Sequence, residues 1–195
     1  MILGLTGFSG AGKSTVAAIF KENGFYHIDC DRLVHHEVYQ DPQVLAALAD
    51  AFGAEILQEQ RLDRAALRAR TMGNTEALKK LNKIVMPFIL AAIQAKMDAH
   101  SNENIILDAP LLLESGLDQK CDRVLSVIAD RREAAERIME RDHLRPEEAE
   151  KRLSSQHPAA FYTEKSDYVL CNSEDLDALH QHTLELIRKI HEEAL

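Results

Sequence analysis

The residues with the clearest chemical potential follow directly on the first apolar run of the chain. Positions 7–14 read Gly-Phe-Ser-Gly-Ala-Gly-Lys-Ser and fit the pattern G-x-x-x-x-G-K-[S/T] at every fixed position. Glycines let a backbone turn tightly, so that successive N–H groups point inward and form a cradle for an anion. A helix that begins in the loop adds the partial positive charge of its N-terminus. The pattern therefore predicts a site for the phosphates of a nucleoside triphosphate.

Separate tasks are predicted for the residues of this loop. The ammonium of Lys13 can reach the β- and γ-phosphates, the hydroxyl of Ser14 can bind Mg²⁺, and Thr15 can hydrogen-bond the α-phosphate. The predicted nucleotide-binding residues are Gly10, Ala11, Gly12, Lys13, Ser14 and Thr15. The alternative is a glycine-rich turn that fits by chance. The position of the loop, between a predicted strand and a predicted helix, favours the functional interpretation.

Two carboxylates follow the second predicted strand at alternate positions, Asp29 and Asp31. In an open α/β sheet, ligands collect at the carboxyl ends of the strands, and alternate residues of a strand point to opposite sides. One carboxylate could face bound phosphates and accept the proton of an attacking hydroxyl, while the other supports the site. The alternative is that both acids are turn or cap residues of the next helix, a task that suits Asp31 ahead of Arg32.

The elements that must position these residues follow from the hydrophobic pattern. Strands are predicted at 2–5, 25–28, 104–108, 123–128 and 168–172. Helices are predicted at 14–22, 44–52, 65–70, 75–85, 87–99, 131–142, 146–156 and 176–193. The opening order of strand, glycine loop, helix and strand is typical of a parallel sheet. The predicted fold class is α/β: a P-loop NTPase-type parallel sheet with flanking helices, built from 1–31 and 101–195 and interrupted by a mostly helical insert at 32–100.

The composition excludes several other classes of protein. A chain of 195 residues suffices for one globular unit with a smaller inserted subdomain. No apolar run reaches the length of a membrane span, and the first residues lack the pattern of a signal peptide. Three cysteines without metal-ligand spacing fit a reducing cytoplasm. The net charge of −9 argues against broad binding to nucleic acid. We expect a cytoplasmic protein with neither a membrane nor a nucleic acid as partner.

The glycine loop and the two acids, taken together, resemble the dephospho-CoA kinase family. The matching stretches are Gly-Leu-Thr-Gly-x-x-Gly-x-Gly-Lys-Ser-Thr at 4–15, Ile-Asp-x-Asp at 28–31 and Asp-x-Pro-Leu-Leu-x-Glu at 108–114. Residues 52–68 look like that family's insert, and residues 141–172 look like its lid and last strand, so the resemblance covers essentially the whole chain. The chain departs from the family pattern at Cys30 for alanine, His35 for arginine, Met86 for histidine and Glu174 for glycine.

The resemblance implies transfer of the γ-phosphoryl group of ATP, with Mg²⁺, to the ribose 3′-hydroxyl of dephospho-CoA. Asp31 would be the base for that hydroxyl, Asp29 a supporting carboxylate, and Lys13 with Mg²⁺ would hold the transferring group. The insert would bind the acceptor, and a small helical lid would span about 141–165. A monomer or a weak homo-oligomer is expected.

Further candidates each have a structural alternative. Asp108 could orient Mg²⁺ through water or cap a helix before Pro110. Pro110 and Leu111 are expected to pack within the fold, and this segment could also form one wall of the substrate site. Arg64 and Arg68 lie four apart and could contact the phosphates of the substrate or be plain surface.

Arg137 and Arg141 also lie four apart, on one face of a predicted helix. Arginines of a lid could neutralise phosphate charge or stack on adenine. The alternative is a solvated face paired with the neighbouring glutamates. The functional interpretation is favoured only for Arg141, which precedes the predicted hinge at 142–146.

Three other functions compete with the one that the resemblance implies. Another P-loop kinase acting on a nucleoside, nucleotide or sugar acid would share the loop and lid. A GTP-binding switch would carry an Asn-Lys-x-Asp segment, but the single Asn-Lys in the sequence, at 82–83, is followed by Ile-Val. An adaptor with a disabled loop is disfavoured by the intact Lys13, Ser14 and Asp31. Fold alone does not decide the substrate.

Overall fold

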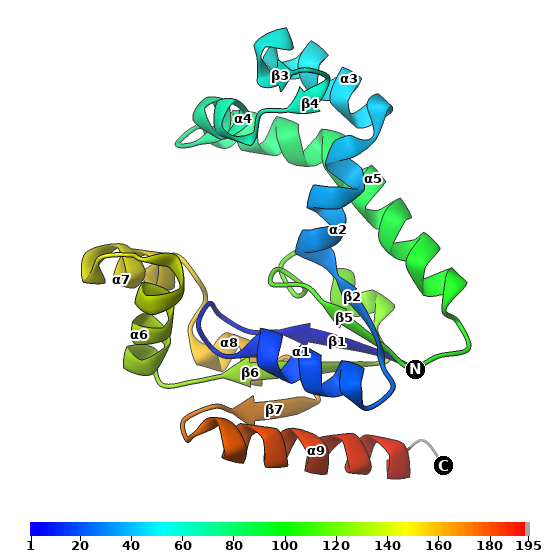
Figure 1. Ribbon diagram of the computed structural model, residues 1–195, viewed down its shortest axis with the longest axis vertical. Coiled ribbons are helices and arrows are strands. Elements are labelled where there is room, and N and C mark those ends of the chain that lie inside the picture. The colour runs from blue at the N-terminus through cyan, green and yellow to red at the C-terminus, as the bar shows by residue number, and fades with distance from the viewer. Residues whose placement is uncertain (194–195) are drawn as a thin grey trace. The chain divides into compact units, whose positions relative to one another are not determined.

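The chain folds into two compact units. The computed structural model describes residues 1–193. One unit consists of Met1–Ile28 together with the residues from His100 onward, and the other is Asp29–Ala99 (Figure 1). The limits of the second unit differ by a few residues from those of the insert predicted at 32–100.

A five-stranded sheet forms the centre of the first unit, in the order β2-β5-β1-β6-β7. Its strands are β1 (Ile2–Thr6), β2 (Tyr26–Asp29), β5 (Ile105–Asp108), β6 (Arg123–Ile128) and β7 (Tyr168–Cys171). β1 pairs in parallel with β5 and with β6, and β6 pairs in parallel with β7. In the register of β1 with β5, Leu5 lies opposite Asp108. The predicted α/β fold with a parallel sheet is confirmed.

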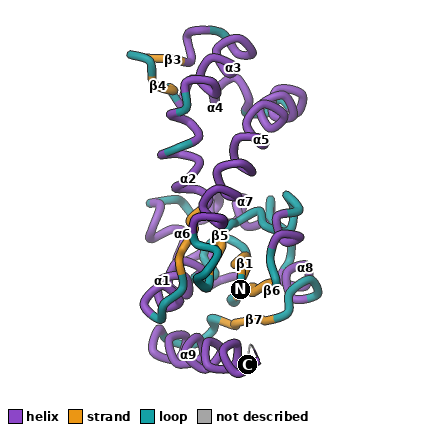
Figure 2. The backbone as a smooth tube through the Cα atoms, turned by 90° about the vertical axis from the view of Figure 1, so that its right-hand side faces the viewer, coloured by secondary structure: helices purple, strands orange, loops and turns teal. Residues whose placement is uncertain are grey.

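The helices of this unit are α1 (Lys13–Glu22), α6 (Arg131–Asp142), α7 (Pro146–Ser154), α8 (Ala159–Thr163) and α9 (Leu176–Glu193), with a 3₁₀ helix η3 (Leu117–Lys120). Helices cover both faces of the sheet, whereas α6 and α7 lie beyond one end of its strands (Figure 1). Figure 2 shows α1 and α8 on opposite sides of the sheet. The sequence pattern does not predict α8, because a five-residue helix is too short to show a helical period. None of the helices within residues 1–193 is long and apolar enough to cross a membrane.

The core of the first unit explains why these elements form. Leu3 and Leu5 of β1 and Leu125 of β6 are fully buried, as expected for parallel strands that are covered on both faces. Helix α1 buries Val16, Ala17, Ile19 and Phe20 and leaves its other side to solvent. An apolar stripe of this kind is stabilised by packing rather than by intrinsic helix propensity. The same packing fixes the start of α1, where the glycine loop ends.

The second unit is almost entirely helical (Figure 2). Its elements are α2 (Cys30–His36), η1 (Val38–Gln40), α3 (Pro42–Phe52), η2 (Ala54–Ile56), β3 (Leu57–Gln58), β4 (Arg61–Leu62), α4 (Arg64–Thr71) and α5 (Thr75–Ala99). β3 and β4 form a short antiparallel hairpin whose turn residues, Glu59 and Gln60, both have positive φ. The sequence pattern does not predict this hairpin, since two-residue strands carry no alternation.

Helix α5 corrects the prediction of two helices at 75–85 and 87–99. It runs without a break from Thr75 to Ala99 and contains Pro87. Proline inside a helix removes one backbone hydrogen bond and typically costs about 3 kcal/mol. Val85, Ile93 and Met97 of α5 are buried, and the helix packs against α2, α3 and α4. Burying a large apolar side chain contributes about 1.5–3 kcal/mol, so this packing offsets the cost of Pro87.

Candidate functional site

The glycine loop between β1 and α1 has the backbone geometry that its sequence predicts. Gly10 and Gly12 have φ of 79° and 103°, in the left-handed region that disfavours side chains. A Cβ at Gly10 would lie 2.4 Å from the carbonyl oxygen of Ala134, and one at Gly12 would lie 2.4 Å from Nδ2 of Asn172. Both positions therefore require glycine for conformation and for space. The loop is pressed closely against α6 and the end of β7.

Lys13 is the first residue of α1 and folds back over the loop. Its Nζ donates to the carbonyl oxygen of Gly7 at 2.7 Å and to that of Phe8 at 2.9 Å. These bonds hold the ammonium above the loop, where the pattern predicts bound phosphate. Ser14, in the first turn of α1, is exposed. The positive end of this helix adds to the charge of the lysine.

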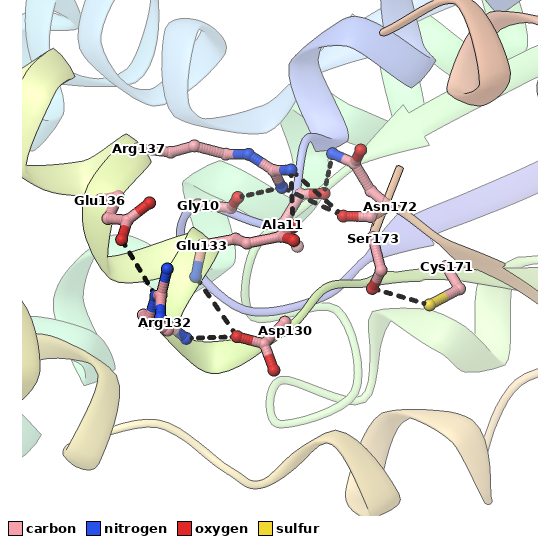
Figure 3. Close-up of polar contacts among 10 residues, drawn as sticks. All are labelled: Gly10, Ala11, Asp130, Arg132, Glu133, Glu136, Arg137, Cys171, Asn172 and Ser173. Atoms are coloured by element: carbon pink, nitrogen blue, oxygen red, sulfur yellow. Dashed lines mark hydrogen bonds and ion pairs between the residues drawn. The ribbon is translucent and has the colours of Figure 1, made fainter. Parts of the chain in front are cut away.

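A buried asparagine and an arginine hold the loop from outside (Figure 3). Asn172, which is 4% exposed, donates through Nδ2 to the carbonyl oxygen of Ala11 at 2.9 Å. Arg137 of α6 donates to the carbonyl oxygen of Gly10 at 3.3 Å and to that of Asn172 at 3.2 and 3.3 Å, and it pairs with Glu133 at 3.1 Å. The two residues therefore hold the carbonyl groups of Gly10 and Ala11 in place from outside the loop.

Sequence reasoning missed these two roles. The pairing of Arg137 with Glu133 agrees with the alternative of a solvated face, but the contacts with Gly10 and Asn172 do not. Two signals were available: the position of Asn172 just beyond the last strand, where parallel sheets collect ligands, and the four-residue spacing from Arg137 to Arg141. Neither signal identifies a loop carbonyl as the partner.

The helix-cap alternative holds for Asp29 but not for Asp31. Asp29 is the N-cap of α2, and its side chain accepts a hydrogen bond from the backbone N–H of Arg32 at 2.8 Å. Asp31 lies within the first turn of α2 and is exposed. The proposed capping by Asp31 is therefore wrong, because the residue two positions earlier already caps the helix. An acid in the first turn still gains from the helix dipole.

Asp108 ends β5, beside β1, and no α-helix follows it: residues 110–116 form turns. The helix-cap alternative for Asp108 is therefore wrong. Nε2 of His27, in β2, lies 3.6 Å from Oδ2 of Asp108. This distance allows an electrostatic interaction but is too long for a hydrogen bond. The carbonyl oxygen of Pro110 accepts from the Thr6 hydroxyl at 3.4 Å, whereas Leu111 is 63% exposed. Because its side chain is so exposed, Leu111 is not part of the hydrophobic core.

Arg64 and Arg68 of α4 line the same hollow within the second unit, with a volume of about 470 Å³. The hollow is also lined by His35, Tyr39, Leu62, Ala65, Leu67, Thr71 and Leu81. The ring of His35 lies 3.2 Å from a guanidinium nitrogen of Arg64. Burial, and then the charge of Arg64, lower the pKa of His35 from its ordinary value. A neutral imidazole beside an arginine leaves that arginine's charge available to an anionic ligand.

Arg141 is held by a neighbouring carboxylate at the end of α6. It donates to both oxygens of Asp142 at 2.8 Å, and Arg152 of α7 donates to the same carboxylate. This cluster of Arg141, Asp142 and Arg152 joins α6 to α7. The hydrogen bonds from Arg141 first, and those from Arg152, hold the pKa of Asp142 well below its usual range. Two arginines thus share one carboxylate, which leaves a net positive charge on this three-residue cluster.

The lowered pKa of Asp142 predicts a pH-dependent stability. Because the pKa is lower in the folded chain, this contribution is complete above the ordinary aspartate pKa and is lost as the pH falls through the folded value. We expect Asp142→Asn to lower the free energy of unfolding by about 1 kcal/mol at neutral pH. The difference from wild type should shrink below about pH 4. Urea unfolding followed by far-UV circular dichroism measures it.

A matched control for this prediction is Glu136→Gln on α6, whose ion pair with Arg132 is largely exposed, at 61% and 87%. Exposed pairs contribute little, so this variant should unfold like wild type at every pH. A wild-type minus Asp142→Asn difference that stays constant on acidification would contradict the assignment.

A parallel sheet, a glycine loop at the carboxyl end of its central strand and a helical arm, α6 and α7, that contacts this loop through Arg137 together define a P-loop kinase. Comparison with known proteins narrows this class. A family model described as Dephospho-CoA kinase matches residues 1–178. The chain belongs to the dephospho-CoA kinase family.

Individual relatives agree with this assignment. A dephospho-CoA kinase of Fusobacterium nucleatum is 36% identical over 180 residues, which covers 92% of this chain and 93% of the relative. The crystal structure of TT1252 from Thermus thermophilus superposes with a TM-score of 0.84 at 29% identity and covers 97% of each chain. A dephospho-CoA kinase structure from Campylobacter jejuni has a TM-score of 0.76 at 26% identity, covering 100% of this chain and 98% of the other.

Proposed function

We propose that this protein transfers the γ-phosphoryl group of ATP to the ribose 3′-hydroxyl of dephospho-CoA and releases CoA and ADP. The observation that carries the proposal is the intact glycine loop, with Lys13 folded over it, in a chain of this family. Transfer of a phosphoryl group depends mainly on positioning and on neutralising charge. A rigid loop with a lysine and a helix N-terminus supplies both.

The donor side of the proposed site is the loop itself. The residues that would bind ATP are Gly10, Ala11, Gly12, Lys13, Ser14, Thr15 and Arg141. The cradle fits a phosphate chain, since the positions that a Cβ would fill are glycines. The Ser14 hydroxyl would hold Mg²⁺, which neutralises phosphate charge when bound. Residues 1–193 contain no group of three acidic, histidine or cysteine side chains placed to hold a metal by themselves, so phosphate oxygens would complete the coordination.

The acceptor side would use acids and arginines. Asp31 would accept the proton of the ribose hydroxyl, and Asp29 would support it while capping α2. Arg64 and Arg68 would bind the anionic groups of dephospho-CoA in their shared hollow. Asp108 would orient Mg²⁺ through water, and Pro110 and Leu111 would form one wall for the substrate. In this proposal residues 32–100 are the substrate-binding part and about 141–165 the lid.

The location and assembly of the enzyme stay predictions. Within residues 1–193, Cys30, Cys121 and Cys171 form no disulfide. Cysteines without disulfides fit a reducing cytoplasm. We propose a cytoplasmic enzyme that acts as a monomer or a weak homo-oligomer. Gel filtration with light scattering would measure its mass in solution.

The test of the proposed function is a coupled ADP-release assay with Mg²⁺ and ATP. Dephospho-CoA is compared with a panel of nucleosides, nucleotides and shikimate, and the mass of the product is determined. Turnover on dephospho-CoA with a gain of one phosphoryl group supports the proposal. Preferential turnover on another acceptor, or none on dephospho-CoA, would overturn it.

Arg141→Ala is expected to weaken the use of ATP. The guanidinium would exchange its hydrogen bonds with Asp142 for bonds with phosphate oxygens, and charge-assisted bonds of this kind contribute about 1.5–3 kcal/mol. We therefore expect kcat/KM for ATP to fall by about 10- to 150-fold. The control is Arg132→Ala on the same helix, whose side chain is 87% exposed. Unchanged KM and kcat in Arg141→Ala would remove this residue from the site.

A further inference from the structure

A second side chain links the helical arm of α6 and α7 to the phosphate loop. Gln156, just beyond α7, accepts through Oε1 a hydrogen bond from the backbone N–H of Ser9 at 2.9 Å. The two residues are 147 positions apart in sequence. Ser9 is the third residue of the loop and lies next to Gly10, whose carbonyl oxygen accepts from Arg137. The centre of the loop is therefore held on two sides, by a donor from α6 and by an acceptor from the end of α7.

The backbone around Gln156 is held in place on both sides. Its backbone N–H donates to the carbonyl oxygen of Leu153, which continues the last turn of α7. The next residue, His157, stacks on the ring of Phe161 at 3.8 Å and lies 3.9 Å from Glu114. Because the backbone is held on both sides, the hydrogen bond to Ser9 has to order only the side chain of Gln156. The contact between Gln156 and Ser9 is therefore well placed to transmit the position of α7 to the loop.

The chemistry of the contact suits a site for a polyanion. The Ser9 N–H is partly buried, and a donor that is shielded from water is costly to leave unpaired. A carboxylate could accept the bond, but it would repel the phosphates of the nucleotide. A carboxamide accepts the bond without a charge, and it also carries an NH₂ group that can donate to phosphate. Glutamine thus satisfies the loop and remains compatible with a bound triphosphate.

We propose that Gln156 is a positioning residue for the nucleotide: through Ser9 it holds the phosphate loop in its binding conformation and couples that conformation to the position of α7. The inference rests on the proposed use of ATP. It explains how the position of the arm that carries Arg141 and Arg152 is coupled to the position of the loop. It assigns to Gln156 an effect on ATP binding and none on the acceptor.

Two variants of Gln156 separate geometry from charge. Gln156→Met keeps the length of the side chain and removes the acceptor, so we expect the affinity for a non-hydrolysable ATP analogue to fall by about threefold to tenfold. Gln156→Glu keeps the acceptor and adds a negative charge, so we expect a larger loss, which diminishes as the salt concentration rises. The KM for dephospho-CoA should change in neither variant.

Isothermal titration calorimetry with the ATP analogue measures this effect without an acceptor substrate. Failure of the proposed function, which the turnover assay detects, is therefore distinguishable from failure of this inference. The matched controls are Gln181→Met and Gln181→Glu, at an exposed glutamine of α9. Circular dichroism establishes that the variants fold, and Gln156→Glu retains the hydrogen bond if Gln156→Met does not fold. Wild-type affinity in Gln156→Glu at low salt would overturn the proposal, as would equal changes in the KM values of both substrates.

Discussion

Lys13→Ala is expected to abolish phosphoryl transfer by this protein. The ammonium group lies above the glycine loop, where it donates to the carbonyl oxygens of Gly7 and Phe8. A bound phosphate chain would offer stronger, charged acceptors at the same place. As the phosphoryl group moves, negative charge develops on its oxygens and on the leaving phosphate. Alanine leaves Mg²⁺ without the lysine that would help it to neutralise this charge.

The expected loss in kcat for Lys13→Ala is at least about 10²- to 10³-fold, the effect of removing one preorganised electrostatic group from an active site. Lys13→Arg should rescue little, since a planar guanidinium does not match the point charge of an ammonium. The ADP-release assay with saturating dephospho-CoA measures the loss. Lys21→Ala, in the last turn of the same helix, is the control. Turnover of Lys13→Ala near that of wild type would exclude the lysine from the reaction.

Asp31→Asn is expected to lose most turnover while ATP binding is retained. The carboxylate would accept the proton of the ribose 3′-hydroxyl as this oxygen attacks phosphorus, and a carboxamide of the same size cannot take up that proton. Removal of a general base typically lowers the rate by about 10²- to 10⁴-fold. The helix should be unaffected, because Asp29, and not Asp31, caps α2.

Two measurements distinguish the roles of Asp31. Steady-state kinetics should show a fall in kcat with an unchanged KM for ATP, and calorimetry should show wild-type affinity for the ATP analogue. Asp41→Asn is a matched control in the same unit, since Asp41 caps α3 and asparagine caps a helix about as well. A turnover number for Asp31→Asn within a few-fold of wild type would show that this carboxylate is not the base.

The sequence alone predicted those features of the protein that are set by residues close to one another in the chain. The glycine loop was predictable because its function depends on residue types at fixed spacing, and Lys13 and Gly12 have one defined place in that spacing. The strands of the parallel sheet were predictable because each is a short apolar run between turn signals. Helix α6 begins and ends where the pattern predicted, since Asp130 caps it and an apolar stripe continues through it.

The tertiary structure decided the contacts between residues far apart in the sequence. Sequence could not show that Arg137 bonds to Gly10 and Asn172, or that Gln156 reaches Ser9, because many partners compete for a long polar side chain and only the fold selects one. Helix α5 passes through Pro87 because burial on other helices outweighs a local penalty. Local spacing thus determined the chemistry of the phosphate loop, whereas packing between distant segments determined which side chains hold it.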